Sequence, residues 1–200
     1  YEMLTFRKER HFTTITYTKM HIINHACNNI SKEHVEKIFQ HTFGYGTFIN
    51  PLTFRGKAVK KNNINAMHDG EIIRCPIDKK KEGYVYQRLI NNHIGNNLVE
   101  DLRITIIHYN PVLCQIKQRS EAARFSRQTS LTYLVDPYQA INDDERKSIS
   151  QFCINLDLEY GSLDVLRDKN DGKIYIVDAN NTPHGPDKLS KKEKRLAVRI

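Results

Sequence analysis

The chain has 200 residues and a net charge of +8, with 39% hydrophobic and 27% charged residues, as in an ordinary globular protein. No apolar run approaches the roughly 18–20 residues that span a bilayer, and the first residues contain no apolar signal-peptide core. The four cysteines form no CxxC pair, which disfavours a zinc ribbon. We therefore expect a cytoplasmic protein with free thiols.

Basic residues gather in two runs, Lys79–Lys81 and the segment 188–195. A positive balance favours polyanionic partners such as nucleic acid, an anionic surface or phosphate groups. Runs of this kind are more often solvated loops or helix faces, so the charge alone does not assign a partner.

In the first half of the chain, residues 11–24 are rich in Thr, Ile and Tyr, which predicts strands at Thr14–Tyr17 and Met20–Asn24. Ser31 is a favourable N-cap, and the apolar residues after it recur at helical spacing, so we expect a helix that ends near Gly44. Further strands are expected, separated by polar loops, at residues 47–49, 57–61, 71–75 and 84–90.

In the second half, residues 102–108 and 111–117 are expected to form an antiparallel pair that turns at Asn110–Pro111. Acidic residues at 143–145 open a helix with one apolar side. A final hairpin follows, with strands at 162–167 and 173–180. Antiparallel strands with a few helices on their faces predict an α+β fold.

This final hairpin carries the most informative polar residues. Asn170–Gly172 suits a three-residue turn in which the glycine takes the left-handed conformation. Such a turn places Asp164 opposite Asp178 on one face of the sheet, and Asn180 shares that face because it lies two residues further on. A two-residue turn would instead place Asp164 opposite Ala179.

Two carboxylates and one amide oxygen on adjacent strands suit Mg²⁺, which takes one or two carboxylates together with phosphate oxygens and water. The intervening apolar residues are expected to point into the core: Leu163, Val165, Tyr175 and Val177. The pattern alone leaves an alternative open, in which the polar residues face solvent on the outer side of an edge hairpin.

The segments Leu163–Asp168 and Asp171–Pro183 also resemble the closing motif of the ATP-grasp family. In that family an Asp on one strand, an acid on the next and an Asn two residues later hold Mg²⁺ against the phosphates of ATP. Asp164, Asp178 and Asn180 match these positions one for one. The resemblance implies an ATP-grasp fold, with largely antiparallel sheets, flanking helices and two lobes that clamp a nucleotide.

The resemblance extends upstream and covers roughly residues 22–186. Lys60 and Lys61 resemble the strand lysine that meets ATP phosphate; spacing does not choose between them, although Lys61 abuts the polar loop. Lys32 resembles a lysine at a helix start that reaches the nucleotide. The strand 84–90 resembles the one that leads into the adenine-binding hinge, which implies nucleotide contacts from Gln87, Arg88, Leu89 and Ile90.

Two arginines resemble catalytic residues of the family. Arg103 matches the arginine of an Asp-Ile-Arg-Val strand that faces phosphate or substrate, and Arg119 matches a basic position on the next strand. The alternative for each cation is a solvated strand residue, and we interpret Lys117 in that way.

The sequence departs from the family in the loop that normally cradles phosphate. Asn62–Gly70 contains a single glycine and cannot hold phosphate mainly through backbone N–H groups. Arg88 stands where the family often has Glu, and no carboxylate for the ribose is evident.

The resemblance implies an ATP-dependent ligase that joins a carboxylate to an amine through an acyl phosphate, with ATP and Mg²⁺, or alternatively Mn²⁺, as cofactors. The expected partners are ATP, a small-molecule or peptide carboxylate and an amine, with no membrane. A kinase of the same fold and a non-catalytic basic module that binds nucleotide or nucleic acid remain alternatives, although no nucleic-acid motif is evident.

The implied organisation has four parts. Residues 1–30 are an entry segment that remains from a preceding domain, and residues 31–90 form a smaller lobe. Residues 91–186 form a larger lobe with the metal site, and residues 187–200 form a basic tail.

Overall fold

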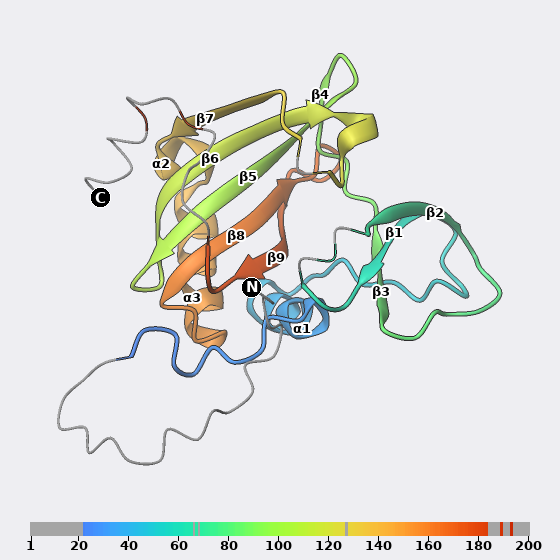
Figure 1. Cartoon of the computed structure of the whole chain (residues 1–200), viewed down its shortest axis with the longest axis horizontal. Coiled ribbons are helices and arrows are strands. Elements are labelled where there is room, and N and C mark those ends of the chain that lie inside the picture. Colours follow the sequence, from blue (N-terminus) through green and yellow to red (C-terminus); the bar gives the residue numbers. More distant parts are fainter. Residues whose placement is uncertain are drawn as a thin grey trace.

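The computed structural model describes residues 22–183 apart from residues 66, 68 and 127, together with Leu189 and Glu193. Its elements are two antiparallel sheets and a few helices (Figure 1). The α+β class predicted from the sequence is therefore confirmed. The strand predicted at Thr14–Tyr17 and nearly all of the basic tail lie outside the described residues.

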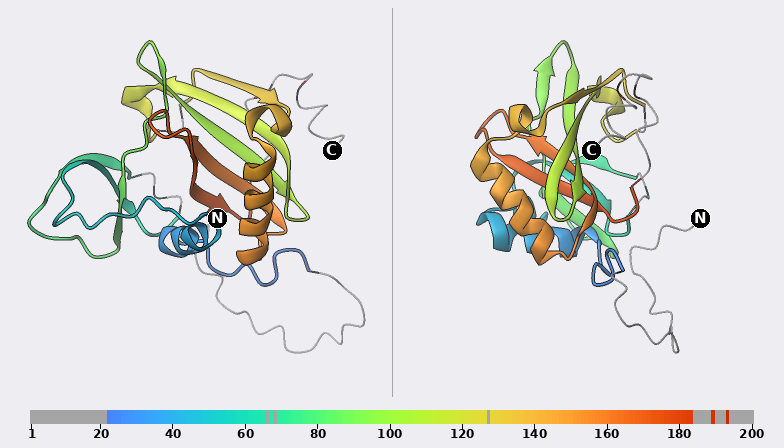
Figure 2. Two further views of the ribbon diagram at one scale, coloured as in Figure 1. Left: turned by 180° about the vertical axis from the view of Figure 1, so that it is seen from behind. Right: turned by 90° about the vertical axis from the view of Figure 1, so that its left-hand side faces the viewer.

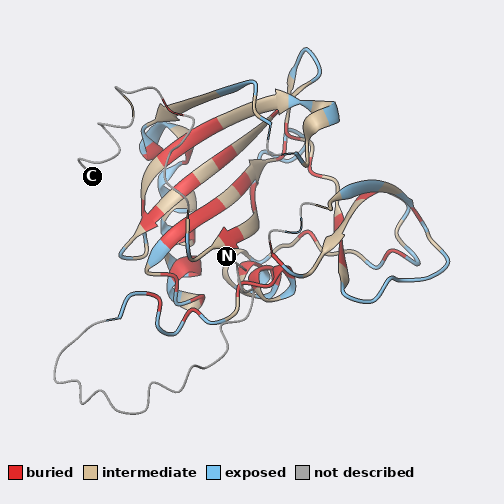
Figure 3. Ribbon diagram, in the orientation of Figure 1, coloured by how far each residue is buried: buried red, intermediate tan, exposed pale blue. Residues whose placement is uncertain are grey.

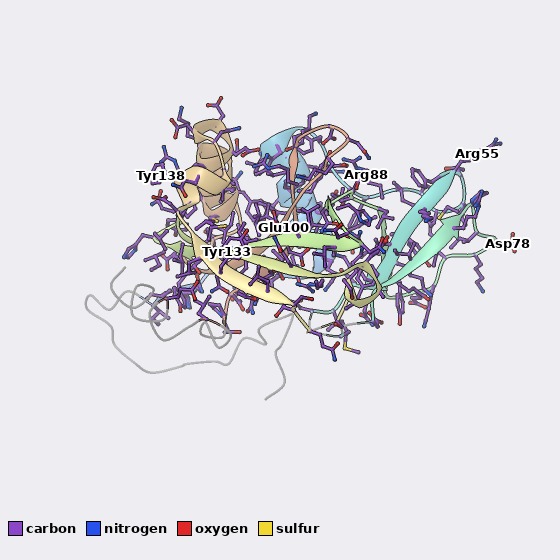
Figure 4. All side chains as sticks on the ribbon, turned by 90° about the horizontal axis from the view of Figure 1, so that it is seen from above. Arg55, Asp78, Arg88, Glu100, Tyr133 and Tyr138 are labelled. Carbon is purple, nitrogen blue, oxygen red and sulfur yellow. The ribbon has the colours of Figure 1, made fainter. Side chains whose placement is uncertain are left out.

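Three strands form a small sheet in the order β2-β1-β3, and we call them and their loops the small lobe. Their bounds are β1 Gly56–Asn62, β2 Glu71–Cys75 and β3 Tyr84–Arg88. In Figure 1 this sheet lies to the right of the larger one, and Figure 4 shows Arg55 and Asp78 at its far end. The strand predicted at 47–49 is wrong, because only Phe48 forms an isolated bridge to Gln87.

A six-stranded sheet has the order β7-β6-β5-β8-β9, with β4 paired to β5. Its strands are β4 His93–Gly95, β5 Leu98–Ile107, β6 Asn110–Ser120, β7 Leu131–Val135, β8 Tyr160–Arg167 and β9 Ile174–Asn180. Two short helical elements lie beside it, η1 Glu121–Ala123 and α2 Pro137–Ala140. The sequence pattern missed β4, β7 and both of these helices. β4 and the two helices have only three or four residues, too short to show a clear period, whereas β7 is as long as the predicted β2.

Helices α1 (Lys32–Phe43) and α3 (Asp143–Asn155) cover one face of the large sheet (Figure 2). The Ser31 hydroxyl accepts from the His34 N–H at 3.4 Å, and Gly44 ends α1 at φ 75°, as predicted. Although α1 belongs to the segment expected in the smaller lobe, it packs on β9 and α3. We call the large sheet with its helices the large lobe.

One hydrophobic core lies between these helices and the sheet, visible as buried bands along the strands in Figure 3. Phe39 of α1, Phe152 of α3 and Ile104 of β5 are all fully buried. Burying each such side chain stabilises the fold by roughly 1.5–3 kcal/mol. All four cysteines are buried and free, as expected.

The strand predicted at Met20–Asn24 is wrong in its described part, since Ile23 and Asn24 lie in a turn. Asn24 adopts φ 58°, and its side-chain amide donates to the carbonyl of Tyr160. No helix among the described residues is long and apolar enough to cross a membrane.

Candidate nucleotide and metal site

The face of the large sheet opposite the helices carries a row of polar residues that crosses four strands. Gln115 pairs with Arg103, Arg103 pairs with Asp164, and Asp164 pairs with Asp178. Directly paired residues share a face, so the four side chains form one line. The predicted pairing of Asp164 with Asp178 is confirmed.

The turn that produces this pairing differs from the predicted one. Asp168 donates its N–H to the Lys173 carbonyl at 2.9 Å, and Arg167 pairs with Ile174, so the turn holds four residues and not three. Continued regularly, that register would place Asp164 opposite Val177. A bulge beside Val177 adds one residue to β9 and brings Asp178 opposite Asp164.

The bulge also changes where Val177 lies. Leu163, Val165 and Tyr175 are buried as predicted. Val177 is only half-buried, touches the edge of the core and lines the polar face as well, because the bulge interrupts the alternation of β9.

A cleft of about 530 Å³ lies between this face and the small lobe. β1, the β1–β2 loop and the segment after β3 form one wall, and β5, β6, β8 and β9 form the other. The charged residues that line the cleft are Lys32, Lys61, Arg88, Arg103, Lys117, Arg119 and Arg124, and Asp69, Asp101, Asp164 and Asp178. Cations outnumber carboxylates by seven to four, which suits a ligand that carries several negative charges.

Among the described carboxylates of the cleft, only Asp178 has a buried oxygen without a hydrogen-bond partner. Its Oδ1 atom is buried and has no hydrogen-bond partner among the described residues. Burial raises the pKa of Asp178, while Lys32 and Lys61 act in the opposite direction. A buried carboxylate oxygen without a donor is costly unless a cation or another donor approaches it.

The other two predicted metal ligands already have partners. The Arg103 guanidinium donates to both oxygens of Asp164, at 2.8 and 2.9 Å. Burial would raise the pKa of Asp164, but Arg103 outweighs it and lowers that pKa. Asn180 Oδ1 accepts from the Thr182 N–H at 2.9 Å.

These three residues fit a hard divalent cation. The orphan oxygen of Asp178 is the natural first ligand, and Asp164 and Asn180 present further oxygens on the same cleft wall. Among the described residues, no group of three or more His, Cys, Asp or Glu side chains is arranged to hold a metal ion. Mg²⁺ commonly takes only one or two carboxylates, together with phosphate oxygens and water.

The structure separates the two candidate lysines. Lys61 lines the cleft and donates to the Val177 carbonyl at 2.9 Å, and burial lowers its pKa to about 8. Lys60 pairs with Glu71 at 2.6 Å and does not line the cleft, because adjacent strand residues point to opposite faces. The assignment of Lys60 to the nucleotide site is therefore corrected.

The remaining predicted lysine, Lys32, is buried beside the β1–β2 loop. Its Nζ lies 3.3 Å from the Ile64 carbonyl and 3.5 Å from Asn65 Oδ1. It lines the cleft with Lys61, so α1 and β1 each contribute one ammonium group.

All four predicted hinge residues line the cleft, but two of their side chains have other tasks. Gln87 is buried and donates to the Thr47 hydroxyl at 2.7 Å. The Arg88 guanidinium reaches Asp168 and Asp171 in the β8–β9 turn, and Figure 4 shows Arg88 where the lobes meet. Among these four, only Leu89 and Ile90 follow the end of β3, where the backbone is irregular, and the Ile90 carbonyl already accepts from the Asn92 N–H at 3.2 Å.

Arg119 lines the cleft from β6, four residues along the strand from Gln115 of the polar row. It pairs with Asp101 at 2.7 Å and donates to the Ser126 carbonyl at 2.9 Å. Arg103, as described above, is held by Asp164. The structure thus brings both predicted arginines into the cleft, each oriented by an aspartate.

Several cleft residues were missed in the sequence, among them Asn65, Asp101, Lys117 and Arg124. Burial lowers the pKa of Lys117 to about 8, so this lysine is not the solvated residue that we expected. Its position had a signal: Lys117 and Arg119 alternate along one strand and therefore share a face. Asp101 lies opposite Lys117 on β5, which only the register reveals.

Known structures with similar folds include two ligases. The D-alanine–D-alanine ligase from Bacillus anthracis, solved with ATP, matches with a TM-score of 0.56 and 16% identity over 85% of this chain and 60% of that one. The ATP-grasp ligase PsnB, solved with a minimal precursor, Mg and ADP, matches with a TM-score of 0.57 and 13% identity over 80% of this chain and 52% of PsnB.

These matches show the fold, because identities this low carry no information on substrates. The chain spans between half and three fifths of the length of these two ligases. No protein-family model matches the chain, and no curated protein does either.

Proposed function

We propose that this chain, which has the ATP-grasp fold, binds Mg²⁺–ATP in the cleft between its lobes and acts as an ATP-dependent ligase that joins a carboxylate to an amine. The observation that carries the proposal is the orphan oxygen of Asp178, which lies in a cleft lined mainly by cations. A divalent cation with phosphate oxygens would satisfy both features at once.

The proposed roles follow from position and charge. Asp178, Asp164 and Asn180 would hold Mg²⁺, which would bridge phosphate oxygens and offset their charge when it is bound. Lys61 and Lys32 would neutralise the inner phosphates, since they line the wall that faces Asp178. Leu89 and Ile90 would receive the base beside the end of β3.

The two arginines would act on the transferred group. Arg103 lies next to Asp164 in the polar row and would bind the γ-phosphoryl group, and then the acyl phosphate that forms on the carboxylate substrate. Arg119, held by Asp101, would orient the substrate. No side-chain nucleophile is required, because the amine attacks the acyl phosphate and displaces inorganic phosphate.

The test is thermal unfolding with and without ADP, ATP and Mg²⁺. A ligand at one hundred times its Kd stabilises the native state by about 2.7 kcal/mol, which a melting curve resolves readily. The wild type should be stabilised by nucleotide with Mg²⁺, and Asp178→Asn should lose the Mg²⁺-dependent part. Asp144→Asn is the matched control, because the Asp144 side chain on α3 is 95% exposed and does not line the cleft.

Stabilisation of Asp178→Asn equal to that of the wild type would count against the metal site. No stabilisation of either protein, combined with binding to nucleic acid that weakens steeply with salt, would support the non-catalytic module instead. If nucleotide binds, ADP release that requires both a carboxylate and an amine identifies a ligase, whereas release with the carboxylate alone identifies a kinase.

A further inference from the structure

β9, which carries two of the proposed metal ligands, is the edge strand of the large sheet. An edge strand exposes backbone carbonyls that need partners outside the sheet. Two such carbonyls lie on either side of Asp178. The Val177 carbonyl accepts from Lys61 Nζ at 2.9 Å, and the Ala179 carbonyl accepts from Asn65 Nδ2 at 3.1 Å.

Both donors belong to the small lobe, so this lobe contacts the large sheet at the peptide groups that precede Asp178 and Asn180. Residues 177 and 179 are two apart, which is the spacing at which carbonyls leave the same side of a strand. The contact between Asn65 and Ala179 is buried, and the relative solvent exposure of Asn65 is only 7%.

The orientation of the Asn65 amide is set from both ends. Its Nδ2 donates to the Ala179 carbonyl, and its Oδ1 lies 3.5 Å from the ammonium group of Lys32. A buried amide that has an acceptor on one side and a cation on the other has only one favourable orientation. Asn65 thereby links β9 to a lysine of the proposed phosphate site.

We infer that Asn65 is a positioning residue for the metal site, which it serves by holding the peptide group that joins Ala179 to Asn180. This inference rests on the proposed function. That peptide group is bonded to the Cα of Asn180, so its orientation sets the direction in which the Asn180 side chain leaves β9, two residues beyond Asp178. Partners that orient metal ligands typically contribute 10–100-fold to metal affinity.

The loop that carries Asn65 is suited to this task. Its neighbour Asn63 caps α1, since Asn63 Oδ1 accepts from the Glu33 N–H at 2.9 Å and the Asn63 carbonyl accepts from the Lys32 N–H at 3.2 Å. The loop is therefore fixed to α1 on one side and reaches β9 on the other. Asparagine side chains thus dock this loop against protein, where the ATP-grasp family has glycines that face phosphate.

The experiment measures metal and nucleotide binding separately. Mn²⁺ binding is followed by the loss of the free Mn²⁺ signal in electron paramagnetic resonance, in the presence of ADP. ADP binding is measured by calorimetry in EDTA. We compare the wild type with Asn65→Ala, with Asn65→Leu, which keeps the side-chain volume, and with Asn63→Ala, the matched control in the same loop.

Both Asn65 variants should bind Mn²⁺ about tenfold more weakly than the wild type. Their loss of ADP affinity without metal should be smaller than that, and it comes only from the weak contact of Asn65 with Lys32. Asn63→Ala should lower the melting temperature through loss of a helix cap but leave Mn²⁺ affinity unchanged. If Asn65→Ala does not fold because it leaves a cavity, Asn65→Leu decides alone, because leucine keeps the side-chain volume.

Equal Mn²⁺ affinity in the wild type and a folded Asn65 variant would overturn the inference while leaving the proposed function intact. A matching loss of ADP affinity in EDTA would also overturn it, because it would make Asn65 a nucleotide contact. A wild type that binds neither ADP nor Mn²⁺ would remove the proposed function and this inference together.

Discussion

Two half-buried lysines, Lys61 and Lys117, make the cleft sensitive to pH. Burial lowers the pKa of each to about 8, so both are charged below that pH and neutral above it. Binding of phosphate favours the charged form. Nucleotide affinity should therefore be full below pH 8 and fall by up to about tenfold per lysine for each pH unit above it. Calorimetric titration of ADP in EDTA from pH 7 to pH 9.5 measures this directly.

A double variant, Lys61→Arg with Lys117→Arg, is the control for that titration. Arginine stays charged throughout the range, so the affinity of the double variant should not change with pH. A wild-type affinity that is constant to pH 9.5 would show that neither ammonium group both titrates in this range and contacts the phosphates.

Lys60 and Lys61 provide a contrast between adjacent residues with opposite orientations. Lys61→Met should weaken ADP binding by about 10–100-fold, because a charge-assisted hydrogen bond contributes roughly 1.5–3 kcal/mol. Lys60→Met should leave ADP binding unchanged and cost at most about 1 kcal/mol of stability, because its pair with Glu71 lies at the surface. Calorimetry and thermal unfolding on the two variants check both statements, and a loss of affinity in Lys60→Met would reverse the assignment.

At the scale of single residues, the sequence predicted which residue types belong to the cleft better than it predicted which way their side chains point. The pairing of Asp164 with Asp178, which places the proposed oxygen ligands together, could be predicted from the hairpin, although the turn and the bulge that produce it could not. Lys60 and Lys61 could not be separated, because the choice depends on which face of β1 meets the large lobe. Lys117 was misjudged for a related reason, since its burial comes from residues distant in sequence.

At the scale of elements, the turn between β8 and β9 depends on one glycine. Gly172 adopts φ 72° and donates its N–H to the Asp168 carbonyl at 2.8 Å, with open space around its Cα. Gly172→Ala should therefore cost about 1–2 kcal/mol through backbone strain alone. In a domain of this length that lowers the melting temperature by roughly 2–4 °C per kcal/mol.

Gly172→Asn is the informative control, because Asn tolerates the left-handed conformation better than Ala. Its melting temperature should lie between those of the wild type and the Ala variant. If the Ala variant has the same melting temperature as the wild type, the turn has another conformation in solution.

Helix α1 and the β8–β9 hairpin differ in how far the local sequence determines their structure. The ends of α1 were predictable because Ser31 and Gly44 act on their own turns. The pairing of Asp164 with Asp178 was predicted from a three-residue turn, whereas the chain reaches it through a longer turn and a bulge beside Val177. A bulge depends on what the strand packs against, which here is the small lobe at the Val177 carbonyl. The local sequence therefore does not predict it.

At the scale of the whole molecule, the lobes are joined where β3 ends. The Arg88 guanidinium lies 3.2 Å from Asp168 Oδ2 and 3.1 Å from Asp171 Oδ2, and it stacks 4.4 Å from the centre of the Tyr175 ring. A backbone bond supports this contact, since Lys169 donates its N–H to the Asn91 carbonyl at 2.8 Å. The chain segment proposed to receive the base is thus attached to the turn of the hairpin proposed to bind the metal.

Arg88→Ala should weaken this attachment strongly, because Asp168 has no solvent exposure and would keep an unpaired charge. Breaking a buried pair costs about 3–5 kcal/mol, and the 30% exposure of Arg88 reduces our expectation to about 2–3 kcal/mol. Arg88→Lys should recover only part of the loss, since an ammonium group cannot reach both carboxylates in the same planar geometry. Urea denaturation monitored by circular dichroism gives these free energies.

The double variant Arg88→Ala with Asp168→Asn separates the charge pair from other effects of the substitution. If the pair dominates, the double variant should be more stable than Arg88→Ala, because the buried charge is gone, and the thermodynamic cycle should give a coupling of about 1–3 kcal/mol. Additive losses of stability would mean that the stacking on Tyr175 carries the contact.

The number of unfolding transitions should also change. The wild type should unfold in a single transition, whereas the small lobe of Arg88→Ala should unfold at a lower urea concentration than the large sheet, because the large sheet with its helices contains the hydrophobic core.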